Sequence, residues 1–280
     1  MKTKNQVLYR DHKKPIVWDA FFKFNGTPKP IVIFCHGYKG FKDWGAWDLV
    51  AKCFSEHDFF FVKFNFSHNG GTVDNPIDFP DLEAFAENNY SKELDDLDDM
   101  LNFIASEAFE FNHEININDI TLIGHSRGGG IAILKTSEDQ RITRLITWAS
   151  VSSFGKRIST TEGLEQWKKD GVKYVLNGRT KQHLPHNYQF YEDFKSNEQR
   201  LDIEAAVKRI TTPVLIIHAK GDPTVAFDEA EILKACNSNH NLFPIEGSNH
   251  VFDARHPWAQ DKLPEALQLV VEESISFIKN

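Results

Sequence analysis

The sequence contains little cysteine: only Cys35, Cys53 and Cys236 occur in 280 residues. An odd number of widely spaced cysteines fits neither a disulfide framework nor a cysteine-based metal site, so we expect reduced thiols in the core. Apolar runs long enough to cross a bilayer are absent, and residues 1–6 lack the apolar stretch of a signal peptide. These absences predict a cytoplasmic protein with no membrane span.

Positive charge is also scarce, because 32 Lys and Arg face 40 Asp and Glu, for a net charge of −8. Nucleic-acid-binding proteins need clustered Lys and Arg to contact phosphates, so this balance argues against a nucleic-acid partner. The sequence has no internal repeat and no low-complexity linker, which disfavours a repeat architecture. The length instead suits one large α/β domain with an insertion, acting as a monomer or a homodimer.

Short apolar runs that alternate with helical patterns predict an α/β fold, with a mostly parallel central sheet and helices on both faces. The expected parallel strands are residues 30–35, 59–64, 120–123, 145–150, 213–218 and 242–245. Residues 7–10 and 16–24 should add an antiparallel edge. Residues 1–150 and 201–280 would form this core. Residues 151–200 lack the strand pattern and would form an insertion at the carboxyl end of the sheet, where ligand sites lie.

The stretch Gly124-His125-Ser126-Arg127-Gly128 has the spacing G-x-S-x-G between a predicted strand and a predicted helix. A serine on such a tight turn is forced into a strained backbone conformation, and the two glycines let neighbouring backbone pass without a Cβ clash. The following helix directs its N–H groups and the positive end of its dipole at the site. The pattern predicts that Ser126 is an exposed nucleophile at the end of a strand.

A carboxylate and a histidine follow in the order that this turn requires. Asp222 lies on a loop after the strand 213–218, and His250 lies on a loop after the strand 242–245. In this arrangement His250 takes the serine proton, while Asp222 orients the imidazole and stabilises the imidazolium. The alternative acid is Asp253, which is so close to His250 along the chain that it cannot easily orient the ring.

Two backbone N–H groups are candidates for holding the negative charge that develops on a substrate carbonyl oxygen. One belongs to Arg127, which directly follows the nucleophile at the helix start. The other belongs to Tyr38, in His36-Gly37-Tyr38 after the strand 30–35. The competing interpretation of His36-Gly37 is an ordinary turn.

Two groups of side chains resemble metal ligands, and we interpret neither as a metal site. The acidic residues of the helix that begins near Ser91 fall mostly off its apolar stripe and predict a solvated face. They are Glu93, Asp95, Asp96, Asp98 and Asp99. His183 and His186 have no acidic or cysteine partner nearby in the sequence, so solvent-exposed histidines are expected.

These motifs together resemble the α/β-hydrolase superfamily, and within it the branch of feruloyl- or cinnamoyl-esterase-like and serine-aminopeptidase-like proteins. The resemblance rests on the segments at residues 36–40, 65–70, 124–129, 221–225 and 248–250. It implies a serine hydrolase without cofactor or metal, and a lid at residues 151–200. Two features depart from many relatives: Arg127 stands where Gln or Met is usual, and residues 65–71 lack the pattern Asp-x-x-Gly-x-Gly-x-Ser.

The sequence therefore predicts hydrolysis of a small carboxylic ester, with a short-chain or hydroxycinnamoyl acyl group, through an acyl-enzyme. The alternatives are a peptidase acting on short peptides and a non-catalytic ligand-binding protein. Aromatic side chains of the insertion would form a lid over the acyl pocket or simply anchor the insertion to the core. They are Trp167, Tyr174, Tyr188, Phe190, Tyr191 and Phe194.

Overall fold

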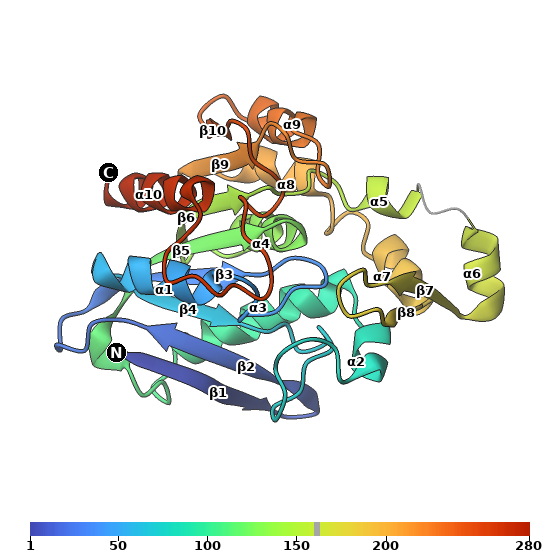
Figure 1. Cartoon of the computed structure of the whole chain (residues 1–280), viewed down its shortest axis with the longest axis horizontal. Helices are drawn as coiled ribbons and strands as arrows, with labels where there is room; N and C mark the ends of the chain where they lie inside the picture. The colour runs from blue at the N-terminus through green and yellow to red at the C-terminus, as the bar shows by residue number, and fades with distance from the viewer. Residues whose placement is uncertain (160–162) are drawn as a thin grey trace.

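The computed structural model describes residues 1–159 and 163–280 and is organised around an eight-stranded sheet (Figure 1). The strand order is β1-β2-β4-β3-β5-β6-β9-β10, and β1/β2 and β2/β4 are antiparallel while all other neighbours are parallel. The strands are β1 (Lys2–Arg10), β2 (Lys13–Phe21), β3 (Lys29–Cys35), β4 (Phe60–Phe64), β5 (Ile115–His125), β6 (Ile142–Trp148), β9 (Val214–Ala219) and β10 (Asn241–Ile245). The predicted fold class, including its antiparallel edge, is confirmed.

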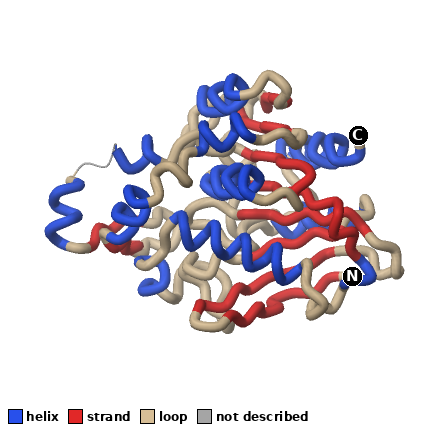
Figure 2. Tube along the Cα trace, turned by 180° about the vertical axis from the view of Figure 1, so that it is seen from behind, coloured by secondary structure: helices blue, strands red, loops and turns tan. Residues whose placement is uncertain are grey.

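Helices cover both faces of the sheet. On β3, Ile31 and Ile33 join one hydrophobic cluster while Val32 and Phe34 join the other, as the two-residue period of a strand requires. Helices α1 (Trp47–Glu56) and α10 (Glu265–Lys279) cover one face (Figure 1). The opposite face, visible in Figure 2, carries α3 (Tyr90–Ile104), α4 (Arg127–Glu138), α8 (Ile203–Arg209) and α9 (Asp228–Cys236). Both faces being buried explains why the central strands are continuous apolar runs.

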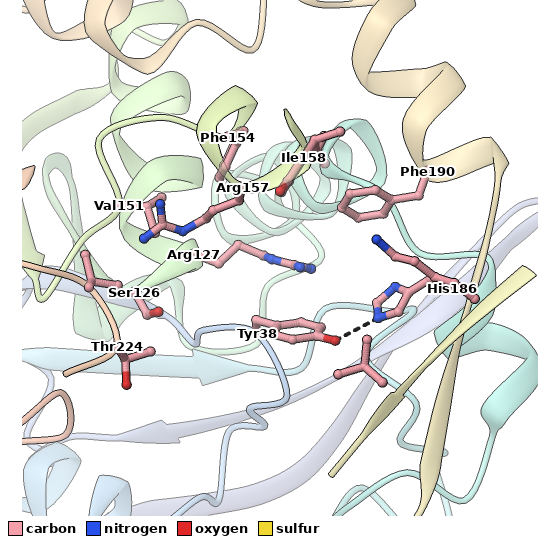
Figure 3. Close-up of a pocket in the computed structure, with 14 residues that line it drawn as sticks. Tyr38, Ser126, Arg127, Val151, Phe154, Arg157, Ile158, His186, Phe190 and Thr224 are labelled. Carbon is pink, nitrogen blue, oxygen red and sulfur yellow. Dashed lines mark hydrogen bonds between the residues drawn. The ribbon is translucent and has the colours of Figure 1, made fainter. Parts of the chain in front are cut away.

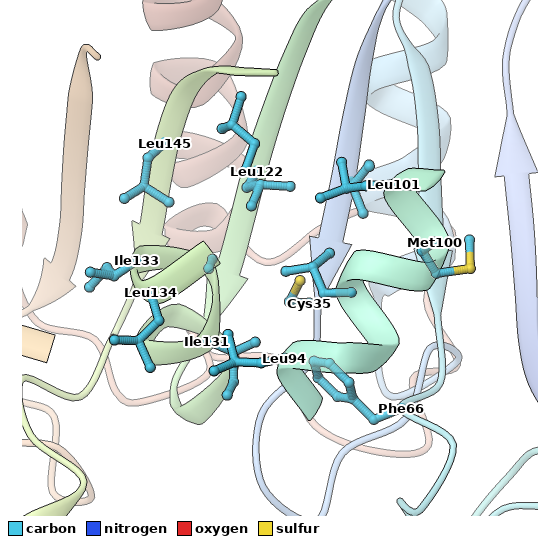
Figure 4. Packing of buried hydrophobic residues seen from close by; sticks show 14 of the residues in the cluster. Cys35, Phe66, Leu94, Met100, Leu101, Leu122, Ile131, Ile133, Leu134 and Leu145 are labelled. Carbon is cyan, nitrogen blue, oxygen red and sulfur yellow. The ribbon is translucent and has the colours of Figure 1, made fainter. Parts of the chain in front are cut away.

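The position of α4 depends on side chains that interlock with the sheet and with α3 (Figure 4). Ile131 and Leu134 of α4 lie in one cluster with Leu94 of α3 and Leu122 of β5, and all four are fully buried. Burying each side chain contributes roughly 1.5–3 kcal/mol. This packing fixes the N-terminus of α4, where the candidate nucleophile lies.

Residues 151–200, predicted as a lid, form short elements at one side of the sheet (Figure 1). These elements are α5 (Gly155–Ser159), α6 (Leu164–Asp170), α7 (Gln189–Ser196) and the antiparallel pair β7 (Val172–Leu176) and β8 (His183–Asn187). Residues 160–162 of the predicted lid lie outside the described residues. Of its aromatic side chains, Phe190 and Phe194 pack against Tyr90 of α3, whereas Tyr174 is exposed. Several rings therefore anchor this segment to the core.

The chain between β4 and β5 includes α2 (Leu82–Ala86) and the short 3-10 helix η1 (Asn112–Glu114). The side chain of Gln189 in α7 contacts Asn89 at 2.8 Å, which ties the insertion to the start of α3. Within the two described ranges, no helix has both the length and the apolar character needed to cross a membrane.

Three carboxylates beside β2, from Asp19, Asp43 and Asp48, lie close enough together to suggest a metal site. Lysine ammonium groups instead supply the positive charge that a metal ion would bring. Lys63 lies 2.6 Å from both Asp19 and Asp43, and Lys42 lies 2.8 Å from Asp19. Because ammonium groups already lie against the buried Asp19 and the half-buried Asp43 and Asp48, we interpret the cluster as an ion-pair network that joins β2, β4, α1 and the loop before α1.

Candidate active site

Ser126 stands at the sharp turn between β5 and α4, with a φ of 57° and a ψ of −121°. A positive φ is strained for a residue with a Cβ, so the surrounding structure must hold it. The Ser126 N–H donates to the Trp148 carbonyl at 2.9 Å, and the Gly129 N–H donates to the Ser126 carbonyl at 3.0 Å. These bonds hold the turn in the conformation that the sequence predicts.

The two glycines of the motif are required by close approach of backbone. A Cβ on Gly128 would lie 2.4 Å from the carbonyl oxygens of both Cys35 and His36, and a Cβ on Gly124 would lie 2.3 Å from the carbonyl oxygen of Gly128. Carbonyl groups in a strand and a turn cannot move away as a flexible side chain would. The spacing therefore lets β3, β5 and α4 meet at Ser126.

Replacing Gly128 with alanine should destabilise the fold by about 2–3 kcal/mol, because the new methyl group overlaps two backbone oxygens. Urea unfolding measures this change in free energy. The control is Gly178→Ala, since Gly178 is exposed and a Cβ there meets no atom within 4 Å. We expect the control to stay within about 0.5 kcal/mol of the parent chain. Equal stability of the two variants would contradict the steric explanation.

The structure brings Ser126, His250 and Asp222 into one chain of hydrogen bonds. The Ser126 hydroxyl lies 2.9 Å from Nε2 of His250, and Nδ1 of His250 lies 2.7 Å from Oδ2 of Asp222. The other Asp222 oxygen accepts the N–H groups of Thr224 and Val225 at 2.7 and 3.0 Å, which orients the carboxylate. The predicted nucleophile, base and orienting acid are thus within the reach that acyl transfer would require.

Asp253, the alternative acid, is exposed, and its N–H donates to Asn249. No hydrogen bond or ion pair joins Asp253 to His250 in the described part of the chain. Burial raises the pKa of Asp222, but hydrogen bonds from His218 and His250 outweigh burial and hold that pKa well below its usual value. Asp222 is therefore ionised at neutral pH and suited to stabilise a cationic imidazole.

His125, which directly precedes Ser126, contacts the loop that bears His250, and the sequence did not reveal this role. Its Nε2 lies 2.9 Å from the carbonyl oxygen of His250, and its ring packs against Trp47. Burial and then the proximity of His250 lower the pKa of His125 to about 3. A neutral His125 that donates to this carbonyl positions the loop bearing His250.

The loop after β3 touches the nucleophile. A Cβ on Gly37 would lie 2.9 Å from the Ser126 Cβ. His36 holds the loop: its Nε2 accepts the Phe66 N–H at 3.2 Å and its Nδ1 donates to the Gly37 carbonyl at 2.9 Å. Among the described residues, the N–H groups of Tyr38 and Arg127 have no acceptor. Two unpaired donors at the nucleophile fit the oxyanion hypothesis, which stays a prediction.

Two cavities adjoin Ser126. One, of about 270 Å³, is lined by Ser126, by apolar side chains such as Phe154 and Phe190, and by the cationic residues Arg127 and Lys173 (Figure 3). The other, of about 250 Å³, includes Trp44 and His250 in its lining. Ser126 and Tyr38 line both cavities. A substrate with its carbonyl at Ser126 can therefore place one part in each cavity.

The Arg127 side chain lies in the middle of the first cavity (Figure 3). Its guanidinium lies 4.3 Å from the centre of the Tyr38 ring and 3.2 Å from an oxygen of the buried Glu93. Glu93 therefore corrects the prediction of a solvated acidic face on α3. Asp96 corrects it too, being buried against Arg10 at 2.7 Å and Ser67. Helical periodicity does not predict that Glu93 and Asp96 are buried, because the arginines that pair with them lie in distant segments of the chain.

His186 was predicted to be exposed, and this is wrong. It is buried on β8, with Nε2 2.7 Å from the Tyr38 hydroxyl, whereas His183 is exposed as predicted. Burial, followed by the charge of Arg127, lowers the pKa of His186 to about 3. Burial raises the pKa of Tyr38 to about 12. A neutral pair thus links the loop after β3 to the insertion.

His186 should make stability depend on pH. Its pKa falls from 6.5 in the unfolded chain to about 3 in the folded chain, so the unfolded state binds more protons between these values. Folding stability is therefore complete above about pH 6.5 and is lost as the pH falls, by up to about 1.4 kcal/mol per pH unit for this residue. Urea unfolding of the parent chain and of His186→Gln at about pH 7, 6 and 5 measures how the unfolding free energy of each depends on pH and so isolates the contribution of His186. Parallel pH profiles would contradict this prediction, and His183→Gln on the same strand is the control.

No protein-family model matches the sequence, and no curated protein matches it. Solved structures do resemble it. Est1E from Butyrivibrio proteoclasticus with bound ferulic acid has a TM-score of 0.74 at 19% identity, covering 98% of both chains. The α/β hydrolase GrgF from Penicillium sp. sh18 has a TM-score of 0.67 at 15% identity, covering 100% of this chain and 98% of the other.

An acylaminoacyl peptidase from Pyrococcus horikoshii is also similar, with a TM-score of 0.64 at 14% identity, covering all of this chain but 41% of the peptidase. Likeness at this level of identity shows the fold. It confirms that the chain has the architecture of the superfamily that its sequence resembles.

Proposed function

We propose that this chain, which has the α/β-hydrolase fold, is a serine hydrolase that cleaves carboxylic esters through an acyl-enzyme. The observation that carries the proposal is the hydrogen-bond relay from Ser126 through His250 to Asp222. A serine hydroxyl is a weak nucleophile unless a base accepts its proton, and the His250 imidazole at 2.9 Å is placed to be that base.

In the proposed reaction, Oγ of Ser126 attacks the ester carbonyl and its proton passes to Nε2 of His250. The N–H groups of Tyr38 and Arg127 stabilise the oxyanion, and the dipole of α4 adds to this effect. The imidazolium, paired with ionised Asp222, then protonates the departing alcohol. Water attacks the acyl-enzyme with His250 as base, which releases the acid and restores Ser126.

The two cavities support a small ester, because each is near or below the lower end of the size range of small-molecule sites. The likeness to an esterase structure with bound ferulic acid keeps hydroxycinnamoyl esters among the candidates alongside short-chain esters. In this proposal residues 151–200 act as a lid that contributes Phe190 and Lys173 to the wall of the larger cavity.

Peptide hydrolysis is the second candidate, on the strength of the peptidase neighbour. A peptidase that recognises a free amino terminus needs a carboxylate near the nucleophile to pair with the ammonium group. None of the residues found to line the two cavities is Asp or Glu, and Lys and Arg occur in both linings. The charge of the described site therefore disfavours a peptidase that recognises a free amino terminus.

The test is a rapid-mixing assay with p-nitrophenyl esters of increasing acyl length, a feruloyl ester and an aminoacyl arylamide. We expect a burst of nitrophenol stoichiometric with enzyme, because an acyl-enzyme accumulates when deacylation is slow. Faster turnover of the arylamide than of every ester would support the peptidase. Saturable binding with no turnover of any substrate would support the ligand-binding alternative.

A further inference from the structure

We infer that the cavity containing Arg127 accepts an acyl group that ends in a free carboxylate, with Lys173 and Arg127 as its anchors. This inference concerns the substrate class and rests on the esterase function proposed above. Its starting point is the charge of the cavity: Arg127, Arg157 and Lys173 line it, and no acidic side chain is found in its lining.

Lys173 differs from the other two cations in its partners. Glu93 pairs with Arg127, and Glu229 lies 2.8 Å from Arg157. Lys173 has no carboxylate within ion-pair distance in residues 1–159 and 163–280, and its ammonium instead lies 3.7 Å from the centre of the Trp167 ring. It is half-buried on β7. A half-buried ammonium that faces a cavity without a fixed counter-ion is suited to an anionic ligand.

Arg127 supplies hydrogen-bond donors to the same cavity. A guanidinium has five N–H groups, and the described structure shows one hydrogen bond from this one, to Glu93. The ring centres of Tyr38, Tyr90 and Phe190 lie 4.3, 5.2 and 5.5 Å from the central carbon of the guanidinium. These three rings hold the guanidinium plane in place. The remaining N–H groups are available to a carboxylate in the geometry that arginine favours.

More than half of the other lining residues are apolar, and they define the remainder of the acyl group. This apolar lining includes Val151, Phe154, Ile158 and Val175 from the insertion and Val225 from the loop after β9. A short hydrocarbon chain suits these contacts, with the ester carbonyl at one end and the carboxylate at the other. The substrate class is therefore the monoester of an aliphatic dicarboxylic acid. The net charge of −8 would repel such an anion at long range, so the attraction must be local.

The experiment compares monoethyl esters of succinic, glutaric, adipic and pimelic acids with ethyl esters of unsubstituted acids of the same length. Ethanol release gives kcat/KM for each. We expect the parent chain to prefer a carboxylate-bearing ester. Lys173→Met should lower kcat/KM for that ester about tenfold more than it lowers kcat/KM for the uncharged ester, the usual effect of losing a charge-assisted contact, so the preference for the charged ester should fall about tenfold.

Two further variants control for charge and folding. Lys169→Met removes an exposed cation of α6 outside the cavity and should leave the preference unchanged. Lys173→Arg retains the charge and should retain the preference. An unaltered ratio in Lys173→Met, or an equal loss in Lys169→Met, would overturn the inference.

A binding measurement separates this inference from the proposed function. Calorimetry with free adipate on Ser126→Ala, with and without Lys173→Met, needs no catalysis. If adipate binds to Ser126→Ala in a Lys173-dependent way while the parent chain cleaves no ester, the anion site is supported and the esterase function is rejected. Cleavage of uncharged esters without any preference for the charged ones, and without adipate binding, would support the esterase and reject the anion site.

Discussion

Replacing Ser126 with alanine is expected to lower kcat for p-nitrophenyl acetate by about 10⁴- to 10⁶-fold. The variant loses the hydroxyl that lies 2.9 Å from Nε2 of His250, so no acyl-enzyme can form on this residue. Fold and cavities should persist, because alanine removes one oxygen and keeps the Cβ at the turn. Initial rates with both enzymes under saturating ester measure the loss.

The matched control is Ser137→Ala. Ser137 lies near the other end of α4, where its hydroxyl donates to the Leu134 carbonyl. Its replacement should leave kcat within about twofold, since surface substitutions away from the site have small effects. Activity of Ser126→Ala within tenfold of the parent chain (roughly the scale of a non-catalytic effect) would reject Ser126 as the nucleophile.

Replacing Asp222 with asparagine should lower kcat by about 10⁴-fold. Asparagine keeps an oxygen for the N–H groups of Thr224 and Val225 but presents an NH₂ group to Nδ1 of His250. Nδ1 must then be the acceptor, so the proton sits on Nε2 and His250 cannot take the proton of Ser126. The loss should therefore appear in kcat, measured with p-nitrophenyl acetate at saturating concentration.

Asp253→Asn provides the comparison, because Asp253 was the alternative acid in the sequence. It is exposed and does not contact His250 in the described structure, so we expect kcat within about twofold of the parent value. A larger loss in Asp253→Asn than in Asp222→Asn would mean that Asp253 orients the imidazole during turnover.

The sheet could be predicted from the sequence because its information is local. Continuous apolar runs mark strands that are buried on both faces, and β3, β4, β5 and β9 lie where those runs are. The turn at Ser126 is equally local, since the glycines at positions 124 and 128 are needed wherever a strand and a helix meet so closely. Ser126, Asp222 and His250 each follow a parallel strand, and the carboxyl ends of these strands share one edge of the sheet. The three residues could therefore be expected to lie close together.

Contacts between charged or polar side chains could not be predicted in the same way. Glu93 and Asp96 look like parts of a solvated helix face, and His186 looks like an exposed histidine, until Arg127, Arg10 and Tyr38 are brought beside them. Each of these partners is at least 34 positions distant along the chain. An ionisable group is buried only where such a partner is present, and the hydrophobic periodicity of a sequence does not show which distant residues will be partners.

Local sterics and hydrophobic periodicity specify the strands and helices of the core, the sharp turn at Ser126 and the candidate catalytic residues, so these features could be inferred from the sequence alone. The contact of His250 with Asp222 rather than Asp253, and the shared cavity of Arg127 and Lys173, emerge only in the folded chain. These contacts join residues that lie far apart along the chain, and the direction of each side chain depends on how the elements around it pack.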